Sequence, residues 1–202
     1  MIAGDIGPYA WFDALALAAH LRQAQNDFLR EELQLLGYLA CLLSLYDGRP
    51  TADWRYQFAS TPSGAPFSPS LDAAFARLVE EGHLQQSAEL ECSITEAGAD
   101  ELSELRALRM LTSREPYLEA ASSSCLVVTP GMIRRAISQD PDIRAAFDMN
   151  SRRLLLDDKG LSFAYESLGV FQSALGNASV DLLAPALVWV TYFCQQSELD
   201  VS

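Results

Sequence analysis

The sequence predicts a mainly α-helical protein that carries one small β-hairpin. Apolar residues recur at helical spacing over most of the 202 residues, and only residues 84–94 suggest a pair of short strands. The clearest helix follows Ser68, because Leu71, Phe75 and Leu78 stand four and then three positions apart and so share one helical face. Half of the residues are apolar, so a chain of this length can bury a sizeable core.

Two helices are predicted before this one. Tyr9–Leu29 is amphipathic and needs a partner surface, which we expect from the C-terminal half or from a second copy of the chain. Leu33–Tyr46 is apolar nearly all round, which is typical of a helix buried on several sides. Thr51 should cap a short helix that runs through Trp54, and Tyr56–Phe58 has the residues of a short strand.

The helix after Ser68 has clear start and stop signals. A loop is predicted at residues 61–66, Pro69 fits the first helical turn, and Gly82 permits the left-handed conformation that ends a helix. The strands are expected at Leu84–Ser87 and Leu90–Ile94, and Thr95 should cap a following helix. The leucines expected to face inward from that helix are Leu102, Leu105 and Leu108.

This order of elements resembles the winged-helix family, in which a third helix and a hairpin wing precede a helix that opens with a Thr-x-x-Gly run. The matching run is Ile94-Thr95-Glu96-Ala97-Gly98. Upstream, Tyr56-Gln57-Phe58 and Gly64-Ala65-Pro66-Phe67-Ser68-Pro69-Ser70-Leu71 are similar to the Panacea-type winged helix of toxin-neutralising antitoxins, where a Gly-Pro-Phe-Ser run opens the helix. Here Ala65 separates the glycine from the proline. The residues expected to define the fold are Leu71, Phe75, Leu78, Gly82, Thr95 and Gly98.

The resemblance covers residues 33–111, which is less than half of the chain. It implies a bacterial protein that neutralises or regulates a partner protein, as in toxin–antitoxin or defence systems. It also leaves the alternative of a winged-helix transcriptional regulator that binds DNA.

The C-terminal half is predicted to be entirely helical. Thr129 should cap Pro130–Gln139, and Asp140-Pro141 should open the helix Asp142–Asn150. Two further helices are expected at Leu161–Leu175 and Asp181–Gln196. The last helix is so apolar that it either lies at the centre of a C-terminal bundle or forms an oligomer interface.

These elements suggest three parts. We expect an N-terminal helical extension at residues 1–32, a winged-helix domain at 33–112 and a C-terminal helical domain at 113–202, with a flexible link at 122–124. A homodimer through the N- and C-terminal helices is one arrangement that would cover their apolar faces.

The charge of the chain disfavours nucleic acid as its partner. Fourteen basic and 27 acidic residues give a formal net charge of −13. Within residues 68–108 there are nine acidic residues, whereas the only basic ones are Arg77 and Arg106. A DNA duplex would be repelled by such a recognition helix and wing, because contact with phosphates depends on Lys and Arg. The sequence therefore favours binding to a protein.

Six residues are candidates for contact with that partner. They are the aromatic residues Trp54 and Tyr56 and the arginines Arg134, Arg135, Arg152 and Arg153. The aromatic pair would serve a partner only if it were exposed, and filling of the core is the simpler interpretation. The arginines could dock an acidic partner, although pairing with nearby acids within the chain is the simpler interpretation for them too.

Nothing in the sequence supports an enzyme. The nucleophilic-serine motif, the phosphate-binding loop, the dinucleotide fingerprint and the zinc-binding helix motif are all absent. The two histidines, His20 and His83, have no acid or cysteine at a recognisable spacing, so we predict no cofactor and no metal.

The four cysteines are widely scattered and are not expected to form a disulfide framework, and Cys41 and Cys194, which lie in apolar helical runs, are expected to be buried thiols. No signal peptide is visible, and the longest apolar run, near residues 180–194, is shorter than a membrane span. We therefore expect a cytoplasmic protein with no membrane contact.

Overall fold

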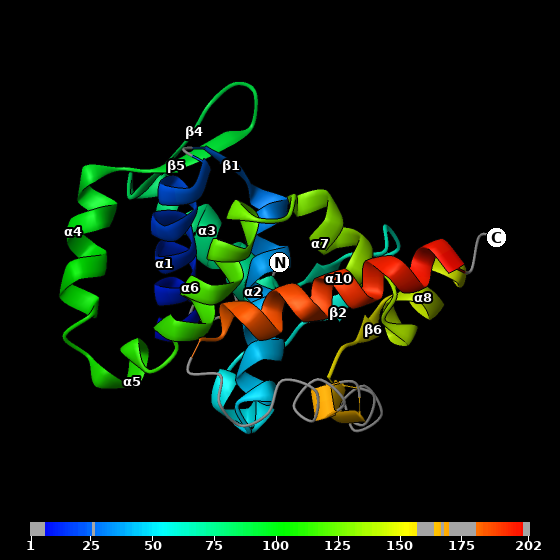
Figure 1. Cartoon of the computed structure of the whole chain (residues 1–202). Coiled ribbons are helices and arrows are strands. Elements are labelled where there is room, and N and C mark those ends of the chain that lie inside the picture. The colour runs from blue at the N-terminus through cyan, green and yellow to red at the C-terminus, as the bar shows by residue number, and fades with distance from the viewer. Residues whose placement is uncertain (1–6, 26, 157–163, 167, 170–180, 200–202) are drawn as a thin grey trace.

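The computed structural model describes residues 7–25, 27–156, 164–166, 168–169 and 181–199 (Figure 1). The protein is mainly helical, as predicted, and the strands in this part of the chain form two small antiparallel sheets. The predicted helix Leu161–Leu175 falls largely outside the described residues.

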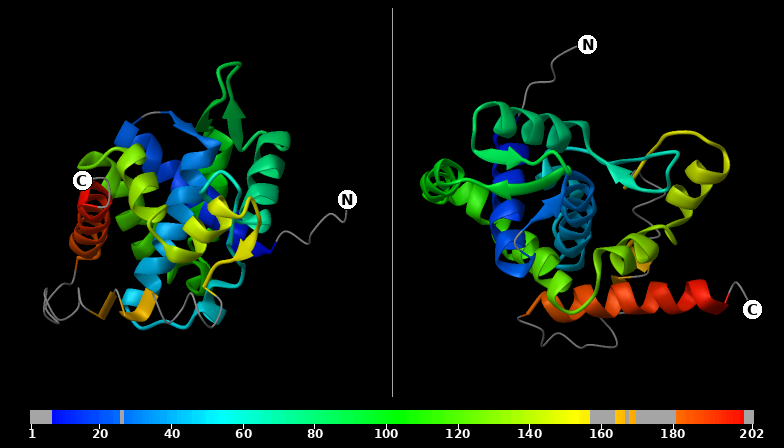
Figure 2. Two further views of the ribbon diagram at one scale, coloured as in Figure 1. Left: turned by 90° about the vertical axis from the view of Figure 1, so that its right-hand side faces the viewer. Right: turned by 90° about the horizontal axis from the view of Figure 1, so that it is seen from above.

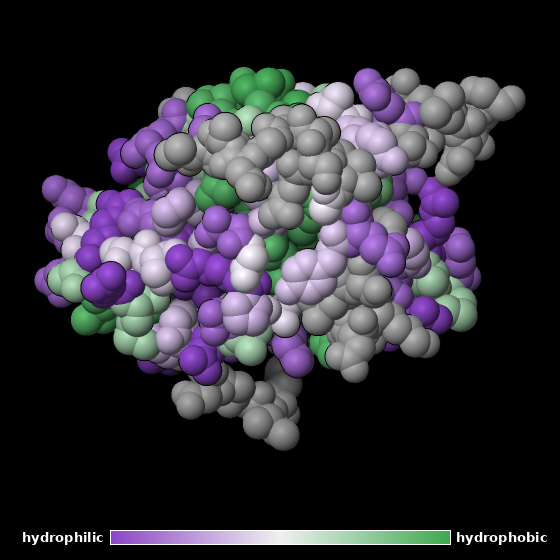
Figure 3. All heavy atoms as spheres, turned by 60° about the horizontal axis from the view of Figure 1, so that its bottom comes forward, coloured by the Kyte–Doolittle hydropathy of each residue, from purple (hydrophilic) through white to green (hydrophobic). Residues whose placement is uncertain are grey.

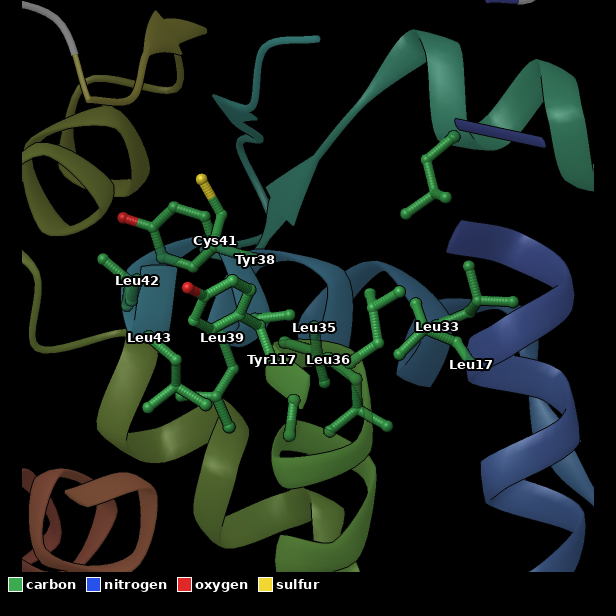
Figure 4. Packing of buried hydrophobic residues seen from close by; sticks show 14 of the residues in the cluster. Leu17, Leu33, Leu35, Leu36, Tyr38, Leu39, Cys41, Leu42, Leu43 and Tyr117 are labelled. Carbon is green, nitrogen blue, oxygen red and sulfur yellow. The ribbon is translucent and has the colours of Figure 1, made fainter. Parts of the chain in front are cut away.

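Helix α2 (Arg30–Tyr46) is the centre of the core. All its residues from Leu33 to Tyr46 are buried, which confirms the prediction of a helix enclosed on several sides. Figure 4 shows its leucines projecting toward different neighbours, with Leu17 of α1 on one side and Tyr117 of α6 on another.

Helix α1 (Pro8–Gln25) packs against both halves of the chain. It contacts α6 in the C-terminal half, as one of our alternatives predicted, and it also contacts α3, α4 and β5. Its apolar residues from Phe12 to Ala18 are already buried within a single chain, so α1 offers little apolar surface to a second copy. The predicted C-terminal end was wrong, because the helix stops at Gln25 and β1 (Phe28–Leu29) pairs with β5.

The segment between α2 and α3 contains a predicted short helix and a predicted strand that was misplaced. The 3-10 helix η1 (Thr51–Trp54) lies where it was expected, but Thr51 is its first residue and does not cap it, because Pro50 holds the capping position. The strand predicted at Tyr56–Phe58 is wrong, because these two rings pack against each other and Phe58 also packs on Tyr38. The pairing strands are β2 (Ala59–Ser60) and β3 (Pro66–Phe67). Strand β6 (Arg153–Leu154) joins from the other half and gives the order β3-β2-β6.

Helix α3 (Pro69–Glu80) is built as its sequence predicts. The hydroxyl of Ser68 accepts a hydrogen bond from the amide of Leu71 at its start, and Gly82, with φ +81°, ends it. Leu71, Phe75 and Leu78 are buried. Gln34 on α2 fixes the helix start, since its side chain bonds both the amide and the carbonyl of Ser68.

The hairpin follows α3 directly. Strands β4 (Leu84–Gln86) and β5 (Glu91–Ile94) pair antiparallel, and β1 lies on the other side of β5, so the order is β1-β5-β4. The tip is tight because Leu90 adopts a left-handed conformation with φ +67°. Leu90 is 64% exposed there.

Helix α4 (Glu96–Leu105) begins with the predicted cap. The Thr95 hydroxyl accepts from the Gly98 amide at 3.1 Å and donates to the Gly82 carbonyl at 2.8 Å. Gly98 lies against the backbone carbonyl of His83, where a Cβ would collide with it and would stand 2.9 Å from Ile94 Cγ1. A glycine is therefore required at this fourth position of the Thr-x-x-Gly run.

The predicted helix with Leu108 on its inward face ends earlier than expected, at Leu105. The chain turns and re-enters a short helix α5 (Arg109–Thr112), and Leu108 at the break is 49% exposed rather than inward. The leucines of α4 itself fit better, with Leu102 buried and Leu105 half-buried.

The C-terminal half continues with α6 (Glu115–Ser123), the 3-10 helix η2 (Ser124–Leu126), α7 (Pro130–Ile137) and α8 (Pro141–Asp148). The caps Thr129 and Asp140 act as predicted. The flexible link expected at residues 122–124 is wrong, because Ser122 and Ser124 are fully buried and the helical path runs through them. The Ser124 hydroxyl donates to the carbonyl of Ala121, which satisfies it inside the helix.

Helix α10 (Leu183–Leu199) packs along α7 and α6 at the surface of the molecule (Figures 1 and 2). Trp189, Val190 and Phe193 are buried on its inner side, whereas Tyr192 is 42% exposed. Figure 3 shows a cluster of hydrophobic residues at the upper edge of one face of the molecule, while hydrophilic and hydrophobic residues are mixed elsewhere on that face. None of the helices in the described part is both long and apolar enough to cross a membrane.

Candidate functional surfaces

The hairpin and α4 carry the most one-sided charge of the described molecule. We call the acidic face the set Glu89, Glu91, Glu96, Asp100, Glu101 and Glu104. No basic residue lies between Leu84 and Leu105, and none of the six carboxylates forms an ion pair with a described residue. Five of the six residues are exposed and Glu101 is half-buried, and Figure 1 shows α4 at one edge of the molecule with the hairpin beside its start.

The acids of α3 are different, because they are largely paired. Asp72 lies 2.7 Å from Arg30 at the start of α2, and Arg77 contacts both Glu80 and Glu81. The outward charge that we predicted for α3 is therefore mostly neutralised. The strong negative charge belongs to the hairpin and α4.

The predicted arginines fall into two groups. Arg134 and Arg135 on α7 line one pocket together with Arg144 of α8. Arg153 on β6 lies 3.9 Å from Asp142, as the pairing interpretation expected, and Arg152 makes no ion pair or side-chain hydrogen bond with a described residue. The four predicted arginines therefore do not form a single patch.

The predicted aromatic pair lies inside the molecule. Trp54 is only 3% exposed, and its ring stacks on the guanidinium of Arg114 at 3.9 Å. Tyr56 is half-buried and donates a hydrogen bond to Asp13 at 2.6 Å. The expectation of an exposed pair is wrong, and the simpler interpretation of core-filling rings describes both residues.

Trp54 and Tyr56 belong to a buried ionic cluster that the sequence did not reveal. Arg114 forms a two-pronged ion pair with Asp13 on α1, with its Nε 2.8 Å from Asp13 Oδ1. It also donates to the carbonyl of Asp53. Both charged side chains are almost fully buried, so the pair joins α1, η1 and the start of α6 in the core.

The cluster raises the pKa values of Tyr56 and Arg114, which preserves the hydrogen bond and the ion pair that these residues form with Asp13. Burial, followed by the negative charge of Asp13, raises the pKa of Tyr56 well above its usual value. Burial alone would lower the pKa of Arg114, but the carboxylate of Asp13 outweighs it and raises that pKa. The phenol therefore stays neutral and the guanidinium charged over the whole physiological range.

A second buried contact, between Tyr38 and Asp140, joins the N-terminal and C-terminal halves. Tyr38 on α2 donates to Asp140, whose other oxygen accepts from the Asp142 amide at 2.8 Å and so caps α8. Burial raises the pKa of Asp140. The contact fixes the corner between α7 and α8, from which Arg144 extends.

The histidines and cysteines are placed as structural residues. Burial lowers the pKa of His20, which lies 3.7 Å from Glu115. Cys41 and Cys194 are buried, as predicted, and burial raises the pKa of Cys41 far from thiolate reactivity. Across the described residues no three His, Cys, Asp or Glu side chains are grouped to hold a metal ion.

Comparison with known proteins identifies no relative of this chain. No protein-family model, no curated protein and no solved structure matches this sequence. The surfaces above are therefore interpreted from their own chemistry.

Proposed function

We propose that the protein is a non-catalytic winged-helix adaptor that binds another protein through the acidic face. Its role would be to regulate or neutralise that partner, as in bacterial toxin–antitoxin and defence systems. The observation that carries the proposal is the acidic face itself, six carboxylates that pair with no described residue, in a stretch from β4 to α4 without one basic residue.

The winged-helix part of the proposal is supported by the order of the elements. Helix α3 is followed by the antiparallel β4–β5 hairpin and by the Thr95-capped α4, which is the order that the resemblance implies. The helix before α3 is the 3-10 helix η1, and the connection between the two runs from Arg55 to Ser68. It is far longer than the roughly 3–4-residue turn of a helix-turn-helix, which speaks against simple docking of η1 and α3 on a duplex.

Electrostatics favours a basic protein surface over a duplex as the partner. A duplex carries one negative charge per about 1.7 Å and is surrounded by condensed counterions. Lys and Arg gain affinity by releasing these counterions from the duplex, and this wing has neither residue. A protein partner can instead present Lys and Arg to the carboxylates. The apolar side chains of Leu90, Leu108 and Met110, all about half exposed or more, would add contact area beside the charge.

The test is a comparison of two variants in protein capture from native cells. The first replaces Glu96, Asp100, Glu101 and Glu104 by their amides, and we expect it to lose a stoichiometric, salt-sensitive protein that the unchanged chain retains. The control neutralises Glu119 and Glu166, which are exposed acids outside both the acidic face and the pocket lined by Arg134 and Arg135, and should retain that protein. Retention of the same protein by the first variant would contradict the proposal.

The alternative is a winged-helix DNA-binding regulator, which the helix–hairpin order alone would favour. A gel shift with duplex DNA at low salt separates the two functions. Tight binding that weakens steeply with salt would replace the adaptor by the regulator. We expect no such binding.

A further inference from the structure

A pocket of about 580 Å³ lies between the Ser63–Gly64 turn of the second sheet and helices α7 and α8. We call it the arginine pocket, since Arg134, Arg135 and Arg144 all line it. Its volume falls within the range of sites that take a small ligand or a few residues of a peptide.

The pocket is positive on a strongly negative protein. Among the described residues that line it there are three arginines and one acid, Asp148. Arg135 makes no ion pair or side-chain hydrogen bond with any described residue. Arg134 reaches only Glu31 among the described acids, at 3.9 Å, and that carboxylate is 80% exposed, so water screens the pair.

The third arginine is held in place. Arg144 donates to the side-chain oxygen of Gln139, whose amide group reaches back to the carbonyl of Arg135 at 3.5 Å. This contact holds the positive charge of Arg144 at the pocket that Arg134 and Arg135 also line.

An apolar wall stands beside the charges. Ile143 is fully buried at the base of the pocket, and Phe147 is 58% exposed at its side. Gly64, with φ +72°, brings the turn so close that a Cβ there would touch the Phe147 ring at 3.4 Å. The turn therefore lies directly beside Phe147 at this edge of the pocket.

We propose that the arginine pocket binds an acidic peptide segment of the partner protein. Carboxylates of the segment pair with Arg134, Arg135 and Arg144, and an apolar side chain beside them packs on Phe147. A single inorganic anion would use the guanidiniums and leave the Phe147 wall bare, whereas a peptide uses both. The proposal rests on the proposed function in one respect, that the partner is a protein.

The test measures fluorescence anisotropy of a labelled Glu-Phe-Glu-Glu peptide on the full chain at low salt. We expect binding that is at least about tenfold weaker for Arg135→Glu and for the double variant R134Q/R135Q, since close charge pairs carry much of such affinities. The control is Arg152→Glu, which changes the same charge on an exposed arginine outside the pocket and should bind normally. Unchanged thermal melting should accompany each variant, because these arginines are exposed.

Three results would overturn the proposal. One is equal binding of a Gln-Phe-Gln-Gln peptide, and another is equal binding by the Arg135→Glu variant. The third is complete displacement by inorganic phosphate at matched ionic strength, which would identify a small-anion site. Weaker binding of a Glu-Ala-Glu-Glu peptide is expected from the lost contact with Phe147, and equal binding would remove that contact from the proposal.

These outcomes are separate from those of the adaptor test. The peptide assay needs no native partner and leaves the acidic face untouched. Loss of peptide selectivity would overturn the pocket while the adaptor stands, and salt-sensitive DNA binding would overturn the adaptor whatever the peptide does.

Discussion

The acidic face and the arginine pocket carry opposite charges and are built in opposite ways. The acidic face comes from one uninterrupted stretch, and its framework is local, with Thr95 and Gly98 locked onto the end of α3. The arginine pocket is assembled from a turn after β2 and from two helices of the other half. One surface thus depends on neighbours in sequence, and the other depends on how the two halves dock.

The largest effect should come from the buried pair that joins the halves. Arg114→Met leaves Asp13 charged and unpaired in the core, so we expect a loss of about 3–5 kcal/mol in the free energy of unfolding. Urea denaturation measures it. If the halves dock as described, hydrogen exchange should accelerate at the arginine pocket at least as much as at the acidic face.

A double variant serves as the control for that experiment. In Asp13→Leu with Arg114→Met both charges are gone, and much of the lost stability should return, because no uncompensated charge remains buried. A double variant as unstable as the single one would show that the hydrogen bond from Tyr56 and the stacking on Trp54, rather than the ion pair, hold the cluster.

The next effect tests the local framework of the acidic face. Gly98→Ala forces a Cβ against the His83 carbonyl, and we expect a loss of about 1–3 kcal/mol from this overpacking. Gly131→Ala is the matched control, since Gly131 is exposed on α7 and its Cβ would have room. Equal thermal stability of the two variants would show that the Thr-x-x-Gly run is not a packing requirement.

A smaller effect is expected at the turn beside the arginine pocket. Gly64→Ala places a side chain at φ +72° and close to Phe147, which should cost about 1 kcal/mol of stability. Binding of the acidic peptide should change little, because a Cβ at 3.4 Å makes ordinary contact with the Phe147 ring, and protein capture by the acidic face should stay unchanged. Parallel loss of both activities would show that the two surfaces are coupled.

The smallest effect is a pH dependence that arises between the halves. Burial holds the pKa of His20 below its usual 6.5, so the unfolded chain binds a proton more readily than the folded one. Stability should therefore fall as the pH drops through 6.5, with a slope that His20→Asn reduces. Chemical denaturation at a series of pH values measures the slope, and an identical slope in the variant would assign it to other groups.

Local signals in the sequence were sufficient to predict helix α3, its end at Gly82 and the cap at Thr95, because each of these features depends on residues within one or two helical turns. The same holds for Thr129 and Asp140. Composition misled the prediction at residues 122–124, since a serine run resembles a linker although Ser124 can satisfy its hydroxyl on the preceding turn.

The long-range contacts were beyond prediction. Arg114 and Asp13 are 101 positions apart, and nothing in either neighbourhood marks the other as its partner. The arginine pocket shows the same limit, since Arg134 and Arg135 were candidates but their meeting with Arg144 and the Gly64 turn depends on docking. Strands of two residues such as β2 and β6 are too short to leave a periodic pattern.

The second sheet also bears on the order of folding. Its central strand β2 pairs with β6, and the Ser60 hydroxyl bonds the backbone of Arg153, 93 positions away. Closing so long a loop costs entropy that only two short strands repay, so this pairing is expected to form after the α1–α2–α3 core. On the ribosome, β2 and β3 emerge long before their third strand, and the arginine pocket is completed only after α8 has been made.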